Sequence, residues 1–166
     1  MTQVQVKESK ITDELPGLVR ALIEPGIAAT IGSAATFSSV DTWYQKLEKP
    51  SFNPPRWVFG PAWTTLYVLM GIADFLVSRE GGEAASKAKG IYRIQLVLNA
   101  VWSVLFFGLR SPLAALVEIV FLWVAILMTI VAFCRVSKPA ALLLVPYFLW
   151  TTFATVLNAA IWKKNR

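Results

Sequence analysis

The apolar residues of this chain are gathered into five long runs, which are separated by polar or charged connections. A helix needs about 20 mostly apolar residues to cross a bilayer, and each run has that length. None of the runs alternates at every second residue, as a strand of a membrane β-barrel does. The pattern therefore predicts an all-α membrane protein, a five-transmembrane-helix bundle with helices at about 18–37, 57–77, 91–109, 113–133 and 140–162.

The connections divide the chain into a polar N-terminal extension, residues 1–16, and one transmembrane domain, residues 17–166. The extension has neither the apolar core of a signal peptide nor the Arg-rich, acid-poor composition of a mitochondrial presequence. The loop at 38–56 is long and contains Trp and Pro, which is typical of a lid or a binding segment. A medium loop is expected at 78–90, and short hinges at 110–112 and 135–139 predict consecutive packing of the last three helices.

Composition narrows the chemistry that the chain can perform. Of its 166 residues 56% are hydrophobic and 16% are charged, and the chain has one Cys and no His. This excludes His-ligated haem, a zinc cluster, a His-based catalytic triad and a disulfide framework. The net charge of +6 comes from Lys and Arg that lie mostly at the ends of the runs, where such residues anchor a helix at the membrane surface. We therefore expect no nucleic-acid partner.

Three acidic residues fall inside the predicted helices, and each costs about 2.5–3.5 kcal/mol at the centre of a membrane. Glu24 is expected to snorkel or to pair with Arg20, one turn away on the same face. Asp74 is expected to reach water near the end of its helix, and Glu118 to lie near the interface. A proton relay through these residues is the less favoured interpretation.

The segment KPSFNPPRWVFGPAWTTLYVLMG, residues 49–71, contains four of the nine prolines. Pro61 lies in the first turns of the predicted helix, where the loss of its backbone N–H has little effect on helix stability. The alternative is that Pro61 kinks the helix and leaves a backbone carbonyl without its hydrogen bond. Trp63 and Tyr67 follow at a spacing of four, which places two aromatic rings on one helix face. This face either lines a binding site or packs on a neighbouring helix.

The last predicted helix, PYFLWTTFATVLNAAIW, repeats Trp150, Ala154, Asn158 and Trp162 at every fourth position. A small residue between Trp and Asn leaves space beside an aromatic wall. An amide in hydrocarbon needs a partner, so Asn158 is expected to face the protein interior. In the third helix Asn99 and Trp102 form a similar pair. The alternative is that both amides only join helices, at about 0.6–2 kcal/mol each.

These motifs resemble the translocator protein family, also called TspO or tryptophan-rich sensory proteins and formerly peripheral benzodiazepine receptors. The resemblance is carried by the two segments quoted above, by LVLNAVWSVLFFG in the third helix and by Pro25 and Gly32, over roughly residues 25–162. It implies a five-helix bundle with a ligand cavity beneath the first loop. It also implies binding of porphyrins such as protoporphyrin IX, of sterols in some members and of benzodiazepine-type drugs. Matched by position, the family's pocket residues are Trp63, Tyr67, Asn99, Trp102, Trp150, Ala154 and Leu157.

The resemblance implies an integral membrane tetrapyrrole-binding protein that acts as a sensor, carrier or regulator of porphyrin levels. No cofactor is required, because the porphyrin is itself the ligand or substrate, and Arg56 and Lys49 near the mouth are expected to pair with its carboxylates. One alternative is an enzyme that degrades porphyrin with light and oxygen, as reported for some bacterial members. The catalytic residues would then be Trp63 and Trp150.

A second alternative is a sterol or lipid translocator. The vertebrate sterol motif needs a Tyr that is missing here between Leu157 and Lys163, although residues 40–46 match a loose cholesterol pattern. Some relatives have a Gly-x-x-x-Gly motif in the third helix, through which two copies of the chain pack together. This chain has Gly90 and Ile94 at these positions, so the sequence leaves open whether it forms a homodimer. The sequence favours a bacterial cell membrane, with the mitochondrial outer membrane as the alternative.

Overall fold

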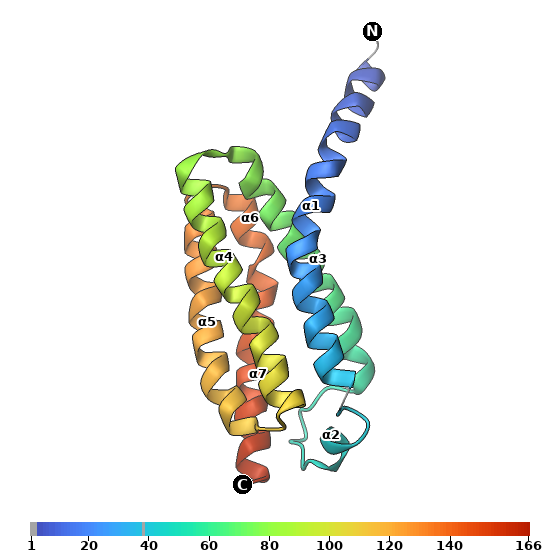
Figure 1. Ribbon diagram of the computed structural model, residues 1–166, viewed down its shortest axis with the longest axis vertical. Coiled ribbons are helices and arrows are strands. Elements are labelled where there is room, and N and C mark those ends of the chain that lie inside the picture. The colour runs from blue at the N-terminus through green and yellow to red at the C-terminus, as the bar shows by residue number, and fades with distance from the viewer. Residues whose placement is uncertain (1–2, 38) are drawn as a thin grey trace.

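The computed structural model of the protein describes residues 3–37 and 39–166, and every regular element in these residues is a helix (Figure 1). One of the elements is a π-helical segment, η1, that continues α4 without a break. The elements are α1 (Gln3–Phe37), α2 (Trp43–Lys46), α3 (Arg56–Glu80), α4 (Gly82–Ser103), η1 (Val104–Gly108), α5 (Pro112–Cys134), α6 (Lys138–Leu143) and α7 (Val145–Lys164).

The described residues contain five segments that are long and apolar enough to span a membrane, which confirms the predicted fold class. The last span consists of two helices, because α6 and α7 follow one another end to end through Leu144. The protein is therefore a multi-pass membrane protein. Its spans are Glu14–Phe37, Arg56–Glu80, Gly82–Gly108, Pro112–Cys134 and Lys138–Lys164.

Two helices begin earlier than the apolar runs suggested. The helix α1 begins at Gln3, so the part of the polar extension that is described continues the first span as a helix; residues 1, 2 and 38 lie outside the described residues. In place of the expected loop at 78–90, α3 and α4 are joined by a tight turn at Gly81 and Gly82. Both glycines have positive φ, at 65° and 80°, a conformation that costs glycine little. The first turns of α4 are polar and alanine-rich, so hydropathy alone could not detect them.

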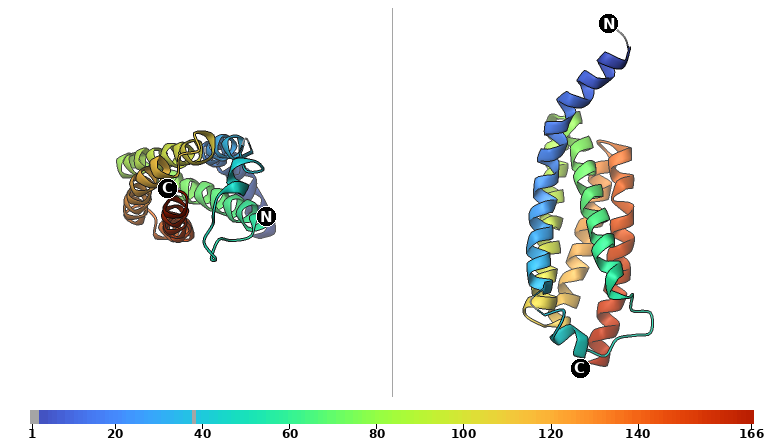
Figure 2. Two further views of the ribbon diagram at one scale, coloured as in Figure 1. Left: turned by 90° about the horizontal axis from the view of Figure 1, so that it is seen from below. Right: turned by 90° about the vertical axis from the view of Figure 1, so that its right-hand side faces the viewer.

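The helices form a ring in which α5 packs against α4 on one side and against α6 and α7 on the other (Figures 1 and 2). This confirms the consecutive packing that the short hinges predicted. The ring continues through α3, which packs on α6 and on α1, and α1 in turn packs on α4 and η1. The core lies inside this ring, with Met70, Tyr92, Phe133 and Tyr147 among its most deeply buried side chains.

Small residues on α1 and α3 set how closely α1 approaches α3 and α4. A Cβ atom on Gly71 would collide with the side chain of Leu22, so the helices touch there. A Cβ on Gly32 would lie 3.1 Å from the Ser103 hydroxyl oxygen, which holds α1 close to the end of α4. In contrast, a Cβ on Gly26 or on Gly60 would meet no atom within 4 Å. The two helices therefore separate toward the end of the bundle that carries the first loop.

The three acidic residues inside the helices predicted from the sequence do not behave as expected. Glu24 pairs with Arg93 of α4, at 2.8 Å, and not with Arg20, because α4 lies directly against α1 at this level. Asp74 does not reach water: it is 3% exposed and forms an ion pair with Lys89 at 3.2 Å. Glu118 is also buried, and neither of its carboxyl oxygens has a hydrogen-bond partner in the described part of the chain.

Candidate functional site

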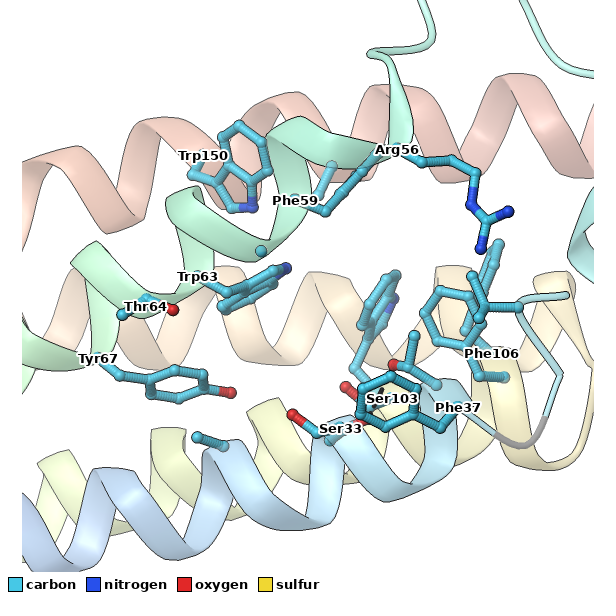
Figure 3. A pocket seen from close by; sticks show the side chains of 18 of the residues that line it. Ser33, Phe37, Arg56, Phe59, Trp63, Thr64, Tyr67, Ser103, Phe106 and Trp150 are labelled. Atoms are coloured by element: carbon cyan, nitrogen blue, oxygen red, sulfur yellow. Dashed lines mark hydrogen bonds between the residues drawn. The ribbon is translucent and has the colours of Figure 1, made fainter.

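A cavity of about 760 Å³ lies at the loop end of the bundle, between α1, α3, η1 and α7 (Figure 3). Its volume falls within the range of sites that bind small molecules or cofactors, about 300–1,000 Å³. The side chains that line it are mostly aromatic or aliphatic. Among the described residues that line it, Arg56 is the only one whose side chain carries a charge at neutral pH. The lining of the cavity therefore suits an apolar ligand.

One aromatic wall comes from α3 and is continued by α7. Trp63 stacks on Tyr67 with ring centroids 5.5 Å apart and an angle of 30° between the planes. Trp63 also meets Tyr147 edge to face at 6.3 Å, and Phe59 meets Trp150 in the same way at 6.0 Å. Figure 3 shows Trp63 and Tyr67 pointing from α3 into the cavity. These ring contacts fix the wall because edge-to-face and offset pairs are favourable arrangements.

The opposite wall comes from the end of α4 and from η1. Trp102 stacks on Phe106 at 5.2 Å with an angle of 20° between the rings, and Phe106 meets Phe107 at 4.9 Å. Single π-helical turns are frequent at functional sites because they shift side chains out of the α-helical register. Here the wider turn places Phe106 and Phe107, which are consecutive in the chain, so that both line the cavity.

The polar groups next to the cavity bond mainly to one another. The Tyr67 hydroxyl donates to Asn99 Oδ1 at 2.6 Å, and Asn99 Nδ2 donates to the Tyr147 hydroxyl at 3.0 Å. At the other side, Trp102 Nε1 donates to Asn158 Oδ1 at 3.2 Å, and Asn158 Nδ2 donates to the Pro112 carbonyl at 2.8 Å. Both asparagines are 1% exposed, so Asn158 faces the protein interior as predicted. Because both amides are already paired, a ligand in the cavity contacts apolar surfaces and no unpaired amide.

The structure brings six of the seven predicted site residues to the cavity, and the seventh lies behind the wall. Trp63, Tyr67, Trp102, Trp150, Ala154 and Leu157 line it. Asn99 does not line it and instead holds the Tyr67 hydroxyl from behind. Their role in ligand binding stays a prediction.

Sequence reasoning missed several lining residues that share a spacing with those it found. Phe59 precedes Trp63 by four positions, and Phe106 follows Trp102 by four. Extending the same four-residue period would have found both. Most of the lining residues of α1, among them Gly26, Ala29 and Ser33, are small, and no chemical signal distinguished them from packing positions.

The first loop closes the end of the cavity and is fixed to the bundle by side chains. Tyr44 of α2 packs against Phe106 and Phe107, and Ser39 Oγ donates to the Phe107 carbonyl at 2.7 Å. Burial raises the pKa of the Tyr44 phenol, so its hydroxyl stays protonated and donates to Asn53 Oδ1 at 3.0 Å. The loop is therefore an ordered cover, consistent with its interpretation as a lid or binding segment.

The far part of this loop is held by the end of the chain. The side chain of Asn165 makes two bonds with the backbone of Glu48: Glu48 N donates to Asn165 Oδ1 at 3.0 Å, and Asn165 Nδ2 donates to the Glu48 carbonyl at 2.9 Å. We call this pair the loop clasp. It joins positions 117 residues apart in the chain and fastens the cover to the C-terminal end of α7.

The two basic residues expected at the mouth have different surroundings. Arg56 lines the cavity and forms an ion pair with Asp41 at 2.6 Å, in which both side chains are more than half exposed. Lys49 is not among the lining residues; its ammonium donates to the backbone carbonyls of Gln45 and Leu47 and lies 4.7 Å from the centre of the Tyr44 ring. Arg56 is therefore the cation that a ligand in the cavity can reach.

Comparison with known proteins gives the family of this chain. The model of the TspO/MBR family matches residues 21–163, which include every residue that lines the cavity. The chain belongs to the TspO/MBR family. It is 47% identical over 152 residues to the tryptophan-rich protein TspO of Archaeoglobus fulgidus, covering 92% of this chain and 97% of that protein.

Relatives from other lineages match over similar lengths. The translocator protein of Homo sapiens is 41% identical over 146 residues, covering 86% of each chain. The tryptophan-rich sensory protein of Cereibacter sphaeroides is 39% identical over 140 residues, covering 82% of this chain and 87% of that protein. This TspO/MBR family member therefore matches archaeal, bacterial and vertebrate proteins across nearly its whole membrane domain.

Proposed function

We propose that the protein binds a tetrapyrrole of the protoporphyrin IX type in this cavity and acts in the membrane as a sensor, carrier or regulator of porphyrin levels. The observation that carries the proposal is the cavity itself: about 760 Å³, with indole and phenyl walls from separate spans. A flat apolar ligand gains about 25 cal/mol for each Å² of apolar surface that it buries. Each well-placed aromatic pair adds about 0.5–1.5 kcal/mol.

The charge distribution supports one orientation of such a ligand. Arg56 lies at the mouth, and the other lining side chains of the cavity are neutral. An ionised carboxylate deep in the cavity would have no cation to pair with, and burying it there would cost several kcal/mol. The acidic edge of the ligand is therefore expected at the mouth, where Arg56 exchanges its bond to Asp41 for a bidentate bond to the ligand.

The test is a titration of the purified protein with protoporphyrin IX, haem and cholesterol, followed by quenching of Trp fluorescence and by shifts of the porphyrin absorption. We expect saturable binding of protoporphyrin IX and at least tenfold weaker binding to Ala154→Phe, whose ring fills space beside Trp150. The matched control is Ala34→Phe, because Ala34 is exposed on α1 and does not line the cavity. Absence of saturable porphyrin binding would contradict the proposal, as would equal affinity of Ala154→Phe and Ala34→Phe. Preferential binding of cholesterol would favour a sterol translocator.

A second candidate function is supported by the placement of two tryptophans. Trp63 and Trp150 both line the cavity, so both indoles would lie close to a bound macrocycle. An indole can give an electron to a photoexcited porphyrin, and oxygen serves as the final oxidant, so this degradation needs no general base. The test follows loss of the porphyrin Soret band under illumination in air. Faster loss than for free porphyrin in detergent, reduced in Trp63→Phe and Trp150→Phe, would support the enzyme; equal rates would reject it.

A further inference from the structure

The buried face of α4 carries a polar side chain at almost every turn. Tyr92, Gln95, Asn99 and Ser103 follow one another at spacings of three and four, so they lie on one side of the helix. All four are buried, with at most 9% of each residue exposed. We call these four residues the polar track. Its last member, Ser103, lines the cavity, so the track leads from the cavity into the half of the bundle that lies away from the loop.

Several polar atoms on and beside the track have no hydrogen-bond partner among the described residues. They include the Tyr92 hydroxyl and both the oxygen and the nitrogen of the Gln95 amide. Beside the track, one carboxyl oxygen of Asp74 and both carboxyl oxygens of Glu118 are also unpaired. A buried polar group without a partner costs about 1–3 kcal/mol, and internal water is the usual remedy where several such groups lie together. Inside a membrane protein, a row of such internal water molecules forms a hydrated path.

The track is connected at both of its ends. At the cavity, the Tyr67 hydroxyl lines the wall and bonds to Asn99, which bonds onward to Tyr147. At the other end, Tyr92 lies within electrostatic range of Asp74. Asp74 pairs with Lys89, and the Lys89 ammonium donates to the exposed Ser78 hydroxyl at 2.7 Å. Polar groups therefore extend from the cavity to the surface at the opposite end of the bundle.

We propose that the polar track holds a chain of internal water molecules and conducts protons between the cavity and the Asp74–Lys89 pair. A proton that binds the Asp74 carboxylate passes to the nearest water. Each further hop forms one O–H bond and breaks another along the track. The net change is the movement of one proton and one positive charge, so no oxidant, reductant or other reactant is needed. Glu118, which lies within electrostatic range of Tyr147, is the second carboxyl that accepts and releases the proton.

The titratable groups that face the track come from all five spans. In their ordinary state carboxylic acids release their protons near pH 4, whereas tyrosine, lysine and arginine hold theirs to about pH 10 or above. The carboxyls are therefore the groups that load and unload the path, and the hydroxyls and amides orient the water between them. The facing groups are Glu24 on α1, Tyr67 and Asp74 on α3, Lys89, Tyr92 and Arg93 on α4, Glu118 on α5 and Tyr147 on α7.

The experiment measures proton entry into potassium-loaded liposomes that contain the full-length protein and a pH-sensitive dye, with valinomycin to fix the membrane potential. We expect the wild-type protein to acidify the vesicles at least about threefold faster than protein-free vesicles. Gln95→Leu and Glu118→Gln are each expected to remove most of this difference, because both interrupt a hydrated path. Gln45→Leu and Glu83→Gln are matched controls that make the same chemical changes at exposed positions, and they should conduct like the wild type.

The thermal stability of Gln95→Leu in detergent gives a second readout. If the interior is dry, leucine removes two unpaired polar atoms and the melting temperature rises. If the interior is hydrated, leucine displaces bound water from its other partners and the melting temperature does not rise. Proton entry no faster than in protein-free vesicles would overturn the proposal. Conduction by Gln95→Leu and Glu118→Gln at the wild-type rate would also overturn it, and if one variant fails to fold the other decides. Porphyrin titration is independent of this outcome.

Discussion

The strongest test of the cavity is the removal of one indole from its wall. Trp150 is half-buried, and its ring is held by Phe59 at 6.0 Å and by Phe153 at 5.8 Å. Because these contacts fix the indole in place, it presents a preformed face to the cavity. Trp150→Ala deletes this face and leaves the surrounding rings where they are.

The size of the effect follows from the two contributions that the indole makes to a bound macrocycle. Stacking on an aromatic ring contributes about 0.5–1.5 kcal/mol. An apolar contact of about 40–60 Å² contributes roughly a further 1–1.5 kcal/mol. The loss of both, about 1.5–3 kcal/mol, corresponds to a decrease in affinity of about 10- to 150-fold. Trp150→Phe keeps an aromatic face and is expected to lose less than about tenfold.

The affinity should be measured from the porphyrin absorption, because removal of an indole changes the protein fluorescence by itself. Trp123→Ala is the matched control: the Trp123 ring lies tilted against Phe148 at 4.7 Å and its Nε1 donates to the Thr152 hydroxyl at 2.8 Å, but Trp123 does not line the cavity. We expect its affinity to stay near the wild-type value. The reasoning is refuted if Trp150→Ala binds porphyrin as tightly as the wild type, or if Trp123→Ala loses as much affinity as Trp150→Ala.

Three further predictions concern the fold around the site. Tyr67→Phe removes the donor to a buried amide oxygen and should lower the free energy of unfolding by about 1–3 kcal/mol in a detergent unfolding assay, and an unchanged stability would contradict the bond. Gly71→Ala forces α1 and α3 apart and should lower the free energy of unfolding by about 1–3 kcal/mol. Gly60→Ala adds a methyl group where there is open space and should raise the free energy of unfolding slightly. If Gly60→Ala were the less stable of the two variants, this packing would be disproved. Asn165→Ala breaks the loop clasp and should raise the dissociation rate of a bound porphyrin in a stopped-flow competition assay, with an unchanged rate arguing against a closing role.

Hydropathy was sufficient to predict the five spans because a lipid environment permits few solutions. Each backbone polar group in hydrocarbon must be satisfied, so a long apolar run can only be a helix. The same argument fails at the ends of the helices. The first turns of α4 lie in a polar, alanine-rich stretch, and only the positive φ angles of Gly81 and Gly82 show where the chain turns.

The partners of the charged residues could not be predicted from the sequence. Arg20 is the nearest cation to Glu24 along its own helix, yet Glu24 pairs with Arg93 from another span. Glu118 lies near a hinge in the sequence, but its side chain turns into the bundle, where it is 8% exposed. Rotation of a helix about its axis is set by its neighbours, and a single sequence with similar apolar content on all sides does not specify it.

The sequence by itself determined the membrane fold and most of one aromatic wall, because a spacing of four residues places Trp63 with Tyr67, and Trp150 with Ala154, on one helix face. Only the tertiary structure decided that these faces converge, that Asn99 stands behind the wall and that the first loop is fastened over the opening. The physical reason is that periodicity records the direction of a side chain relative to its own helix axis. A cavity depends instead on the distance between helices. The close contact at Gly71 and the open space at Gly60 show how this distance differs between two levels of α3.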